Sequence, residues 1–568
     1  MRIMHSPFRV WFGLIMFLCL HGLLVGQELG GNWAFLYRHD GPGDFSDFGH
    51  SVALGGDLNQ DGFCDLVIGT PGARGGGNPG AGTVYVYSGR TGSQLYRWIG
   101  FDAHDRLGFA VDAAGDINGD GVPDLILGAP GAFWDQGRAY LVSGYSGNPI
   151  LEISGNQGNE QLGYSVSELG DVNGDGFGDL VIGALLTDSG GIHDVGGAFV
   201  ISGSDGSRLF EHFGNSNLSR FGAAVDGGKD VNGDGTPDYL VSAYQDDPSG
   251  LTSAGTAWVY SGANGATLYE ISGEEAGDEF GKALALVDDL NQDQFADFLI
   301  SAPEADANGL TLAGKVYLYS GKDGSLLQVF TGEEENQHFG SALAGAGDVD
   351  DDGFPEILIG ASKSNVPGTR DVGAVYLLTS RTWQRMTKIR GKTQHGGYGD
   401  SLAGGKDVNG DGLADWMVGG PREGDPTSLG AVFTYSYLPY MRLESHLFSL
   451  SSNSSLEIRM KFPLSEAGQP FTILFSAAGT GPTNLGGVFV PLTPDPFFQS
   501  LLAGWTPPNL QDGTGRLNSD ATGLARFHHH AALVPHVGKT FYGVAITLDA
   551  GKGLPRLSSV AQPLTILP

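Results

Sequence analysis

An acidic segment of nine residues recurs seven times in this chain and fixes its periodicity. The first copy is Asp57-Leu58-Asn59-Gln60-Asp61-Gly62-Phe63-Cys64-Asp65, and an apolar run comes directly after it. Further copies begin at Asp116, Asp171, Asp230, Asp289, Asp348 and Asp407, and successive copies start 59 residues apart except for one step of 55. Because a period this regular is typical of repeat architectures, the chain is interpreted repeat by repeat.

Each acidic segment has the composition of a calcium-binding loop. Oxygen-bearing side chains occupy positions 1, 3, 5 and 9, and Gly occupies position 6 in every copy but one. Ca²⁺ takes about six to eight oxygens, often from alternate positions of a short loop and one backbone carbonyl. Gly at position 6 permits the sharp turn with positive φ. Turn formation alone would explain one or two acids per loop, so we predict one Ca²⁺ per loop, up to seven in all.

The predicted ligands are the side chains at positions 1, 3, 5 and 9 and the backbone carbonyl at position 7. In chain order they are Asp57, Asn59, Asp61, Phe63, Asp65, Asp116, Asn118, Asp120, Val122, Asp124, Asp171, Asn173, Asp175, Phe177, Asp179, Asp230, Asn232, Asp234, Thr236, Asp238, Asp289, Asn291, Asp293, Phe295, Asp297, Asp348, Asp350, Asp352, Phe354, Glu356, Asp407, Asn409, Asp411, Leu413 and Asp415. Two loops depart from the pattern: Gln294 replaces Gly in one, and Asp350 and Glu356 stand at positions 3 and 9 of the next. The loops differ from EF-hands because position 12 is apolar where an EF-hand has Glu.

Each repeat contains four short segments with the apolar, β-branched and aromatic composition of strands, separated by Gly-rich turns. Seven repeats of four strands predict an all-β fold, a seven-bladed β-propeller over residues 27–438. The seventh copy ends after its third strand, Ala431–Ser436, and residues 32–39 resemble the missing fourth strand. We therefore expect residues 32–39 to complete the last blade and close the ring, which removes exposed sheet edges.

The order of the strands places the connecting loops on two faces. The acidic loops join strands one and two, so the short turns between strands three and four share their face. The longer loops between strands two and three, and those between blades, lie on the opposite face. Variable loops on a rigid scaffold are where binding usually occurs. Phe133, Trp134 and Arg138 form the candidate partner-binding cluster there, because aromatic rings beside a cation suit sugar or protein contacts.

Two interblade loops on this second face are strongly acidic, at residues 274–279 and 333–335. They are interpreted as a solvated rim or, alternatively, as a patch for a cationic partner.

The repeats resemble the FG-GAP repeats of integrin α-subunit β-propellers. Phe-Gly pairs stand at residues 48–49, 221–222, 280–281 and 339–340, and Gly-Ala-Pro stands at 128–130. The acidic loops match the calcium loops of that family. The resemblance covers roughly residues 32–438 and implies a propeller with calcium on one face and partner recognition, as in cell adhesion, on the other. Acidic loops in every blade make the chain more similar to secreted bacterial-type FG-GAP proteins.

The two ends of the chain differ from the repeats. Residues 1–26 have the basic start and apolar stretch of a signal peptide, so we expect a secreted, extracellular or cell-surface protein. No later segment reaches the roughly 18 apolar residues of a membrane span. Residues 439–568 lose the period and alternate like strands, which predicts a small C-terminal β-sandwich-like module. The net charge of −33 argues against a nucleic-acid partner.

The resulting hypothesis is a secreted, calcium-binding propeller that acts as an adhesion or binding scaffold for a protein or cell-surface partner, with no catalysis of its own. A lectin-like module for polysaccharide is the first alternative, and it predicts aromatic pockets between blades near Trp98 and Trp134. A hydrolase or lyase carried on the loops is the second, and it requires a convergent set of His, Tyr or carboxylate side chains. No such set recurs in the repeats.

Overall fold

The computed structural model describes residues 33–43, 46–350, 353–423 and 430–437 and the strands from β29 (Arg442–Leu443) to β40 (Gln562–Leu567). Contacts between Cα atoms divide the chain into two compact units, one formed by most of residues 35–436 and the other by residues 437–568 with two short segments. Each unit is described by itself.

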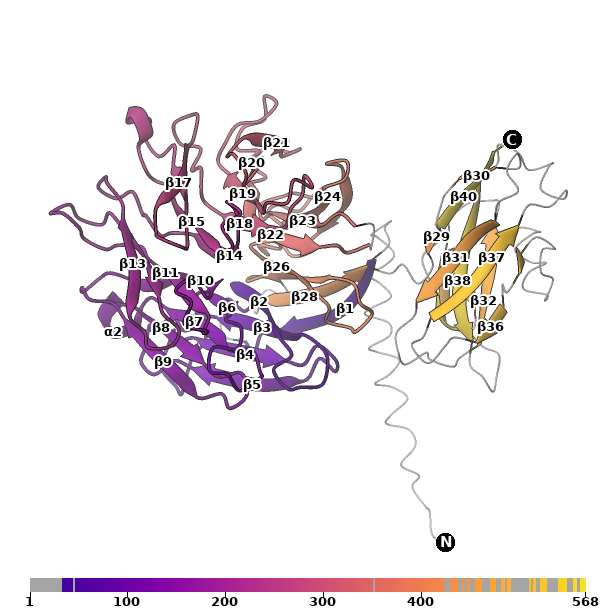
Figure 1. The fold of residues 1–568 in the computed structure, drawn as a ribbon, viewed down its shortest axis with the longest axis horizontal. Coiled ribbons are helices and arrows are strands. Elements are labelled where there is room, and N and C mark those ends of the chain that lie inside the picture. Colours follow the sequence, from indigo (N-terminus) through magenta and orange to yellow (C-terminus); the bar gives the residue numbers. More distant parts are fainter. Residues whose placement is uncertain are drawn as a thin grey trace, which may run out of the picture. The chain divides into compact units, whose positions relative to one another are not determined.

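The first unit is a set of seven four-stranded sheets, which form the seven blades of a β-propeller (Figure 1). Blade by blade, the strands are β2 (Ser51–Gly56), β3 (Asp65–Thr70), β4 (Thr83–Tyr87) and β5 (Gln94–Ile99); β6 (Val111–Ala113), β7 (Leu125–Ala129), β8 (Arg138–Val142) and β9 (Pro149–Ser154); β10 (Leu162–Gly170), β11 (Asp179–Ala184), β12 (Gly197–Ile201) and β13 (Arg208–Phe213); β14 (Val225–Lys229), β15 (Asp238–Ala243), β16 (Thr256–Tyr260) and β17 (Thr267–Ser272); β18 (Leu284–Val287), β19 (Asp297–Ala302), β20 (Lys315–Tyr319) and β21 (Leu326–Thr331); β22 (Phe339–Gly347), β23 (Glu356–Ala361), β24 (Ala374–Thr379) and β25 (Arg385–Arg390); and β26 (Ser401–Lys406), β27 (Asp415–Gly420), β28 (Ala431–Tyr437) and β1 (Trp33–Asp40). The prediction of an all-β, seven-bladed propeller is confirmed.

The burial of the strands explains why the sequence forms stacked blades. The second strand of every blade is buried along its whole length, as in β3 and β23. A strand covered on both faces requires an almost continuous apolar run, and such a run stands directly after each acidic loop. The outer strand contains both partly buried and exposed residues, as in β5. Apolar contacts join neighbouring blades: Val67 of β3 lies in one core cluster with Leu125 and Leu127 of β7.

The inner strands form a closed circle. β2 packs against both β6 of the second blade and β26 of the seventh blade. β1, from the N-terminal side, joins the sheet of β26, β27 and β28. In that sheet the Phe35 ring lies 6.0 Å from the ring of Tyr435, and Gly41 N donates a hydrogen bond to Gly430 O over 3.0 Å.

The glycine at the position of the Phe-Gly signature lies where one blade touches the next; in the second blade it is Gly108, which follows Leu107. Ser51 Oγ donates a hydrogen bond to the carbonyl oxygen of Gly108 over 2.9 Å. A Cβ atom added to Gly69 would lie 2.1 Å from that same oxygen. Gly108 itself has φ 83°, a conformation that Gly adopts without steric cost. The same contact closes the ring, because Ser401 Oγ donates to Gly49 O over 2.8 Å.

Hydrogen bonds between loops confirm the assignment of the faces. The amide of Gly89, in the turn between strands three and four, donates to Asp65 beside the first acidic loop. On the other face, the loop between β3 and β4 bonds to the loop that leads into the second blade, as His104 N donates to Pro79 O over 3.0 Å. This second face is called the loop face below. It carries a short helical turn, α2 (Ala132–Asp135), and a 3₁₀ turn, η2 (Pro248–Gly250).

The second unit consists of short strands. Their bounds are β29 (Arg442–Leu443), β30 (Leu447–Ser449), β31 (Ser455–Lys461), β32 (Pro470–Ser476), β33 (Pro482–Leu485), β34 (Val488–Pro491), β35 (Leu510–Gln511), β36 (Thr514–Arg516), β37 (Thr522–His528), β38 (Thr540–Leu548), β39 (Pro555–Ser558) and β40 (Gln562–Leu567). They form sheets in the orders β29-β31-β37-β35, β30-β40-β38-β32-β36 with β39 beside β38, and β33-β34. The predicted sandwich-like module stays a prediction, and the predicted signal peptide at residues 1–26 lies outside the described residues. No helix within the described residues is long and apolar enough to cross a membrane.

Candidate functional site

The acidic loops connect the first and second strands of each blade, and their side chains first organise the loop itself. In the first loop the carboxylate of Asp57 accepts hydrogen bonds from Asp61 N (2.9 Å) and Gly62 N (2.7 Å). Asp61 accepts one from Phe63 N over 3.2 Å. These bonds curl the chain so that alternate side chains turn toward the inside of the loop.

Position 9 of the loop is buried and ties the loop to the rest of the blade. Asp65 accepts hydrogen bonds from Leu58 N over 2.9 Å and from Gly89 N over 3.1 Å. Burial raises the pKa of Asp65 to about 7, although the two amide donors favour the charged form. The equivalent Asp297 has its pKa raised by burial to about 7 as well. The repeat pattern predicted these carboxylates in the loops but not their bonds to the distant turn.

The donor set fits a hard divalent cation. It consists of carboxylate, amide and carbonyl oxygens, which are the ligands that Ca²⁺ takes. The Oδ1 atom of Asn59 is buried and has no hydrogen-bond partner, so it is available to an ion. The carboxylates of Asp348, Asp350 and Glu356 lie with one oxygen each within 4.8 Å of one another, the one group of three such residues among the described part of the chain.

In the two loops that depart from the pattern, the described residues keep the hydrogen bond from the position-6 amide to the position-1 carboxylate. Gln294 adopts φ 77°, the conformation that Gly has in the other loops, and its amide donates to Asp289 over 2.7 Å. In the next loop Gly353 N donates to Asp348 over 2.9 Å. Asp352 lies outside the described residues. The complete ligand sets, including the position-7 carbonyls, stay a prediction.

On the loop face, the structure brings together two of the three residues of the candidate partner-binding cluster. The Arg138 guanidinium lies over the Phe133 ring, 3.7 Å from its centroid, and forms an ion pair with Glu152 over 2.7 Å. Trp134 points away from them into solvent, with 95% of its surface exposed. Phe133 and Arg138 line a pocket between the first and second blades.

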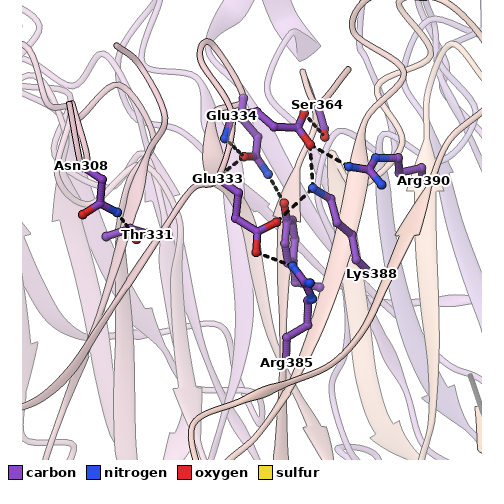
Figure 2. A network of polar contacts seen from close by, with 10 residues as sticks. Asn308, Thr331, Glu333, Glu334, Ser364, Arg385, Lys388 and Arg390 are labelled. Atoms are coloured by element: carbon purple, nitrogen blue, oxygen red, sulfur yellow. Dashed lines mark hydrogen bonds and ion pairs between the residues drawn. The ribbon is translucent and has the colours of Figure 1, made fainter. Parts of the chain in front are cut away.

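The interpretation of residues 333–335 as a patch for a cationic partner is wrong for Glu333 and Glu334. Glu334 accepts hydrogen bonds from Lys388 (2.8 Å) and Arg390 (2.7 Å) of β25, and Glu333 pairs with Arg385 of the same strand (Figure 2). Burial alone would raise the pKa of Glu334, but its bonds to Lys388, the Asn365 amide and Arg390 outweigh burial and hold the pKa at about 2. These acids join the fifth blade to the sixth.

A polar cluster on the inner strands was missed by the sequence reasoning. Ser167 Oγ of β10 lies 3.2 Å from a carboxylate oxygen of Asp112 on β6 and 3.2 Å from one of Asp226 on β14. Burial raises the pKa of Asp226 to about 7, although the hydrogen bond from Leu286 N favours the charged carboxylate and lowers the pKa. The sequence does contain a signal for this cluster. All three residues stand four positions before an acidic loop, where the other repeats have Ala.

The comparisons with known proteins agree with this fold. The model of the FG-GAP repeat family matches residues 48–87, 108–142, 221–260, 280–319 and 339–378. Integrin alpha-5 of Xenopus laevis is 33% identical over 220 residues, which cover 35% of this chain and 20% of that protein. Integrin alpha-V of Gallus gallus is 30% identical over 286 residues, which cover 49% of this chain and 22% of that protein.

An enzyme also carries a similar segment. The human phosphatidylinositol-glycan-specific phospholipase D is 31% identical over 357 residues, which cover 54% of this chain and 42% of that protein. The chain thus spans less than half the length of each of these relatives. The seven-bladed fold and the repeat matches together show that residues 33–437 are an integrin-like FG-GAP β-propeller.

Proposed function

We propose that this protein is a secreted, calcium-stabilised adhesion scaffold that binds a protein or cell-surface partner through its loop face and has no catalysis of its own. An integrin-like FG-GAP propeller supports a binding role in general. The observation that carries the proposal is the separation of two surfaces: acidic loops stiffen one face, and long loops with exposed aromatic side chains occupy the other.

Calcium has a defined role in this proposal. Each loop holds at least three carboxylates, which repel one another unless a cation or a proton neutralises them. A bound Ca²⁺ joins positions 1, 3 and 5 to the position-9 side chain, which already holds the turn between strands three and four. Binding therefore stabilises the blade, because the folded loop binds the ion far better than the unfolded chain does.

The partner surface lies on the loop face around the second blade. Phe133 and Trp134 are 54% and 95% exposed, and large exposed apolar side chains beside a pocket are typical of interaction sites. The propeller fixes the backbone that carries them, so little backbone entropy is lost on binding.

A cell-adhesion assay tests the proposal. The full chain is immobilised, a panel of bacterial and animal cells is applied in millimolar calcium, and retained cells are counted before and after a chelator. We expect retention of at least one cell type that the chelator abolishes and that Trp134→Ala weakens. Tyr145→Ala is the matched control, because Tyr145 is 63% exposed but stands in the turn between β8 and β9 on the calcium face. A folded chain that retains no cells would contradict the proposal.

A further inference from the structure

The pocket beside Phe133 has walls from two blades. The interblade loop contributes Phe101, Asp102 and Asp105, and the second blade contributes Phe133, Arg138, Tyr140 and Glu152. Its volume is about 310 Å³, at the small end of the range for ligand sites. A narrower apolar cavity lined by Trp98, Leu107 and Leu127 shares Phe101, Asp105 and Tyr140 with it. The space suits a single compact ring-shaped group.

Exposed aromatic side chains lie in and beside this pocket, although the Arg138 guanidinium covers one face of the Phe133 ring. Phe101 is 74% exposed and Phe133 is 54% exposed, and Trp134 next to them is 95% exposed. These are three of the four most exposed large apolar side chains among the described residues; Tyr145 is the other. Such a concentration offers flat apolar faces that a ligand can stack against.

The backbone of α2 is strained at the two residues that carry the exposed Phe133 and Trp134 rings. Phe133, Trp134 and Asp135 have φ values of 52°, 60° and 63°. The left-handed conformation costs about 1–2 kcal/mol for each such residue. The Arg106–Asp135 ion pair, at 3.1 Å, helps to hold the turn. Strain of this kind is concentrated at binding sites.

The polar groups of the pocket carry both signs of charge, and this limits the ligand. Arg138 is fixed by Glu152 and by the Phe133 ring, and its Nε atom is buried without a hydrogen-bond partner. Asp105 is buried, and its carboxylate accepts a bond from Asp102 N over 2.8 Å. An anion would meet the carboxylates of Asp102, Asp105 and Glu152, and a cation would meet Arg138.

A wholly apolar ligand would displace water from these groups without replacing its hydrogen bonds, at a cost of about 1–3 kcal/mol for each polar atom left without a partner, as at Arg138 Nε. A neutral sugar avoids the repulsion that an anion or a cation would meet, and it also avoids the loss of hydrogen bonds that an apolar ligand would cause. Its hydroxyl groups both donate and accept hydrogen bonds, so they match the Arg138 guanidinium and the carboxylates together. Its C–H faces are apolar and stack on aromatic rings.

We propose that the pocket between the first and second blades binds one neutral pyranose unit of a glycan, stacked on Phe101 and Phe133 and hydrogen-bonded to Arg138, Asp102 and Glu152. The inference rests on the proposed binding function and names its ligand class.

Titration of the full chain with purified oligosaccharides in calcium tests the inference directly. The probes are neutral glucose, galactose and mannose oligosaccharides, with uronic-acid and sulfated oligosaccharides as the charged series. At least one neutral probe should bind, and Phe101→Ala or Phe133→Ala should weaken it about tenfold, equivalent to about 1.4 kcal/mol. Arg138→Lys should weaken it too, since an ammonium lacks the planar fork of the guanidinium. Tyr145→Ala should bind like the wild type.

Three results would overturn the inference: no neutral probe binds, only charged probes bind, or binding is unchanged in Phe101→Ala and Phe133→Ala. Cells treated with periodate, which destroys vicinal diols of glycans, separate this failure from failure of the adhesion scaffold. If periodate-treated cells are still retained through Trp134, the scaffold function stands and the sugar site is wrong. If untreated cells are not retained at all, the scaffold function itself fails.

Discussion

The buried carboxylate of Asp65 accepts a hydrogen bond from the amide of Gly89, which lies 24 residues further along the chain and in a different turn of the same blade. The same bond recurs between Asp297 and Gly321 over 3.2 Å. Position 9 therefore has a structural role that position 1 lacks, since it joins the acidic loop to the turn between strands three and four through a buried backbone amide. Position 5 reaches the same turn only through a serine hydroxyl, as in the bond from Ser320 Oγ to Asp293 over 3.2 Å.

This difference predicts distinct effects of two substitutions in one loop. In chelator, Asp65→Ala should lower the free energy of unfolding by about 2–3 kcal/mol, because the amides of Leu58 and Gly89 lose a buried acceptor. Asp57→Ala should cost much less in the presence of a chelator, because its partner amides at Asp61 and Gly62 are only part-buried and exposed, respectively, and water can replace the carboxylate. Urea unfolding of both variants measures the difference, and equal losses would show that position 9 is an ordinary loop residue.

The strained turn in the fifth acidic loop predicts a stabilising substitution. Gln294 has φ 77°, and a Cβ atom in that conformation is strained. Gln294→Gly should raise the free energy of unfolding by about 0.5–1 kcal/mol. The reverse change, Gly235→Gln in the preceding loop, should lower it by a similar amount, since Gly235 has φ 86° and open space around it. Changes of the same sign in both variants would contradict this account of position 6.

The contact between the fifth and sixth blades predicts acid sensitivity. The folded-state pKa of Glu334 is about 2, below its ordinary value, so its contribution to stability is complete above the ordinary pKa and is lost as pH falls from about 4.5 to about 2. We expect the wild type to lose about 1–3 kcal/mol more than Glu334→Gln over this interval. Denaturant titrations at several pH values measure it. Glu335→Gln, on the neighbouring acid, is the control, and parallel pH curves for Glu334→Gln and the wild type would count against the network.

The inner-strand cluster predicts the opposite pH dependence. The folded-state pKa of Asp226 is raised to about 7, so the folded protein holds this proton more tightly and its stability falls as pH rises from about 4 to about 7. Asp226→Asn should be more stable than the wild type at pH 8, by about 1–2 kcal/mol. An amide can accept from Leu286 N and donate to Ser167 Oγ at once. A variant less stable than the wild type at pH 8 would show that the ionised carboxylate is favoured there.

Regularity of the sequence explains which parts of the fold were predictable. The spacing of the acidic loops and the apolar run after each one are local signals, and they are enough to predict the blades and the two faces. The place of β1 in the last sheet was predicted from another signal, the resemblance of residues 32–39 to the fourth strand that the seventh repeat lacks. The glycines of the signature were recognised as a motif, but only the structure shows that Gly69 has no side chain because the Gly108 carbonyl occupies that space.

Contacts between residues far apart in the chain could not be predicted in the same way. Glu334 and Lys388 are 54 residues apart and meet only because their blades are neighbours. The sequence alone therefore suggested a solvated rim or a patch for a cationic partner, where the protein has ion pairs between two blades. The left-handed turn at Phe133 and Trp134 could not be predicted, because neither position has the Gly that usually indicates a positive φ. The candidate cluster was identified from residue types alone, and the pocket that Phe133 and Arg138 share required the fold.

Calcium content measured together with thermal stability tests the central claim most directly. The full chain is equilibrated with millimolar calcium, free ions are removed, and bound calcium per chain is determined by atomic emission, with melting followed in calcium and in chelator. The account predicts several bound ions, up to seven, and a melting temperature that falls clearly in chelator; Asp57→Asn should bind one ion fewer and Asp323→Asn, in a turn on the same face, the same number. No retained calcium, with the same melting temperature in chelator, would contradict it.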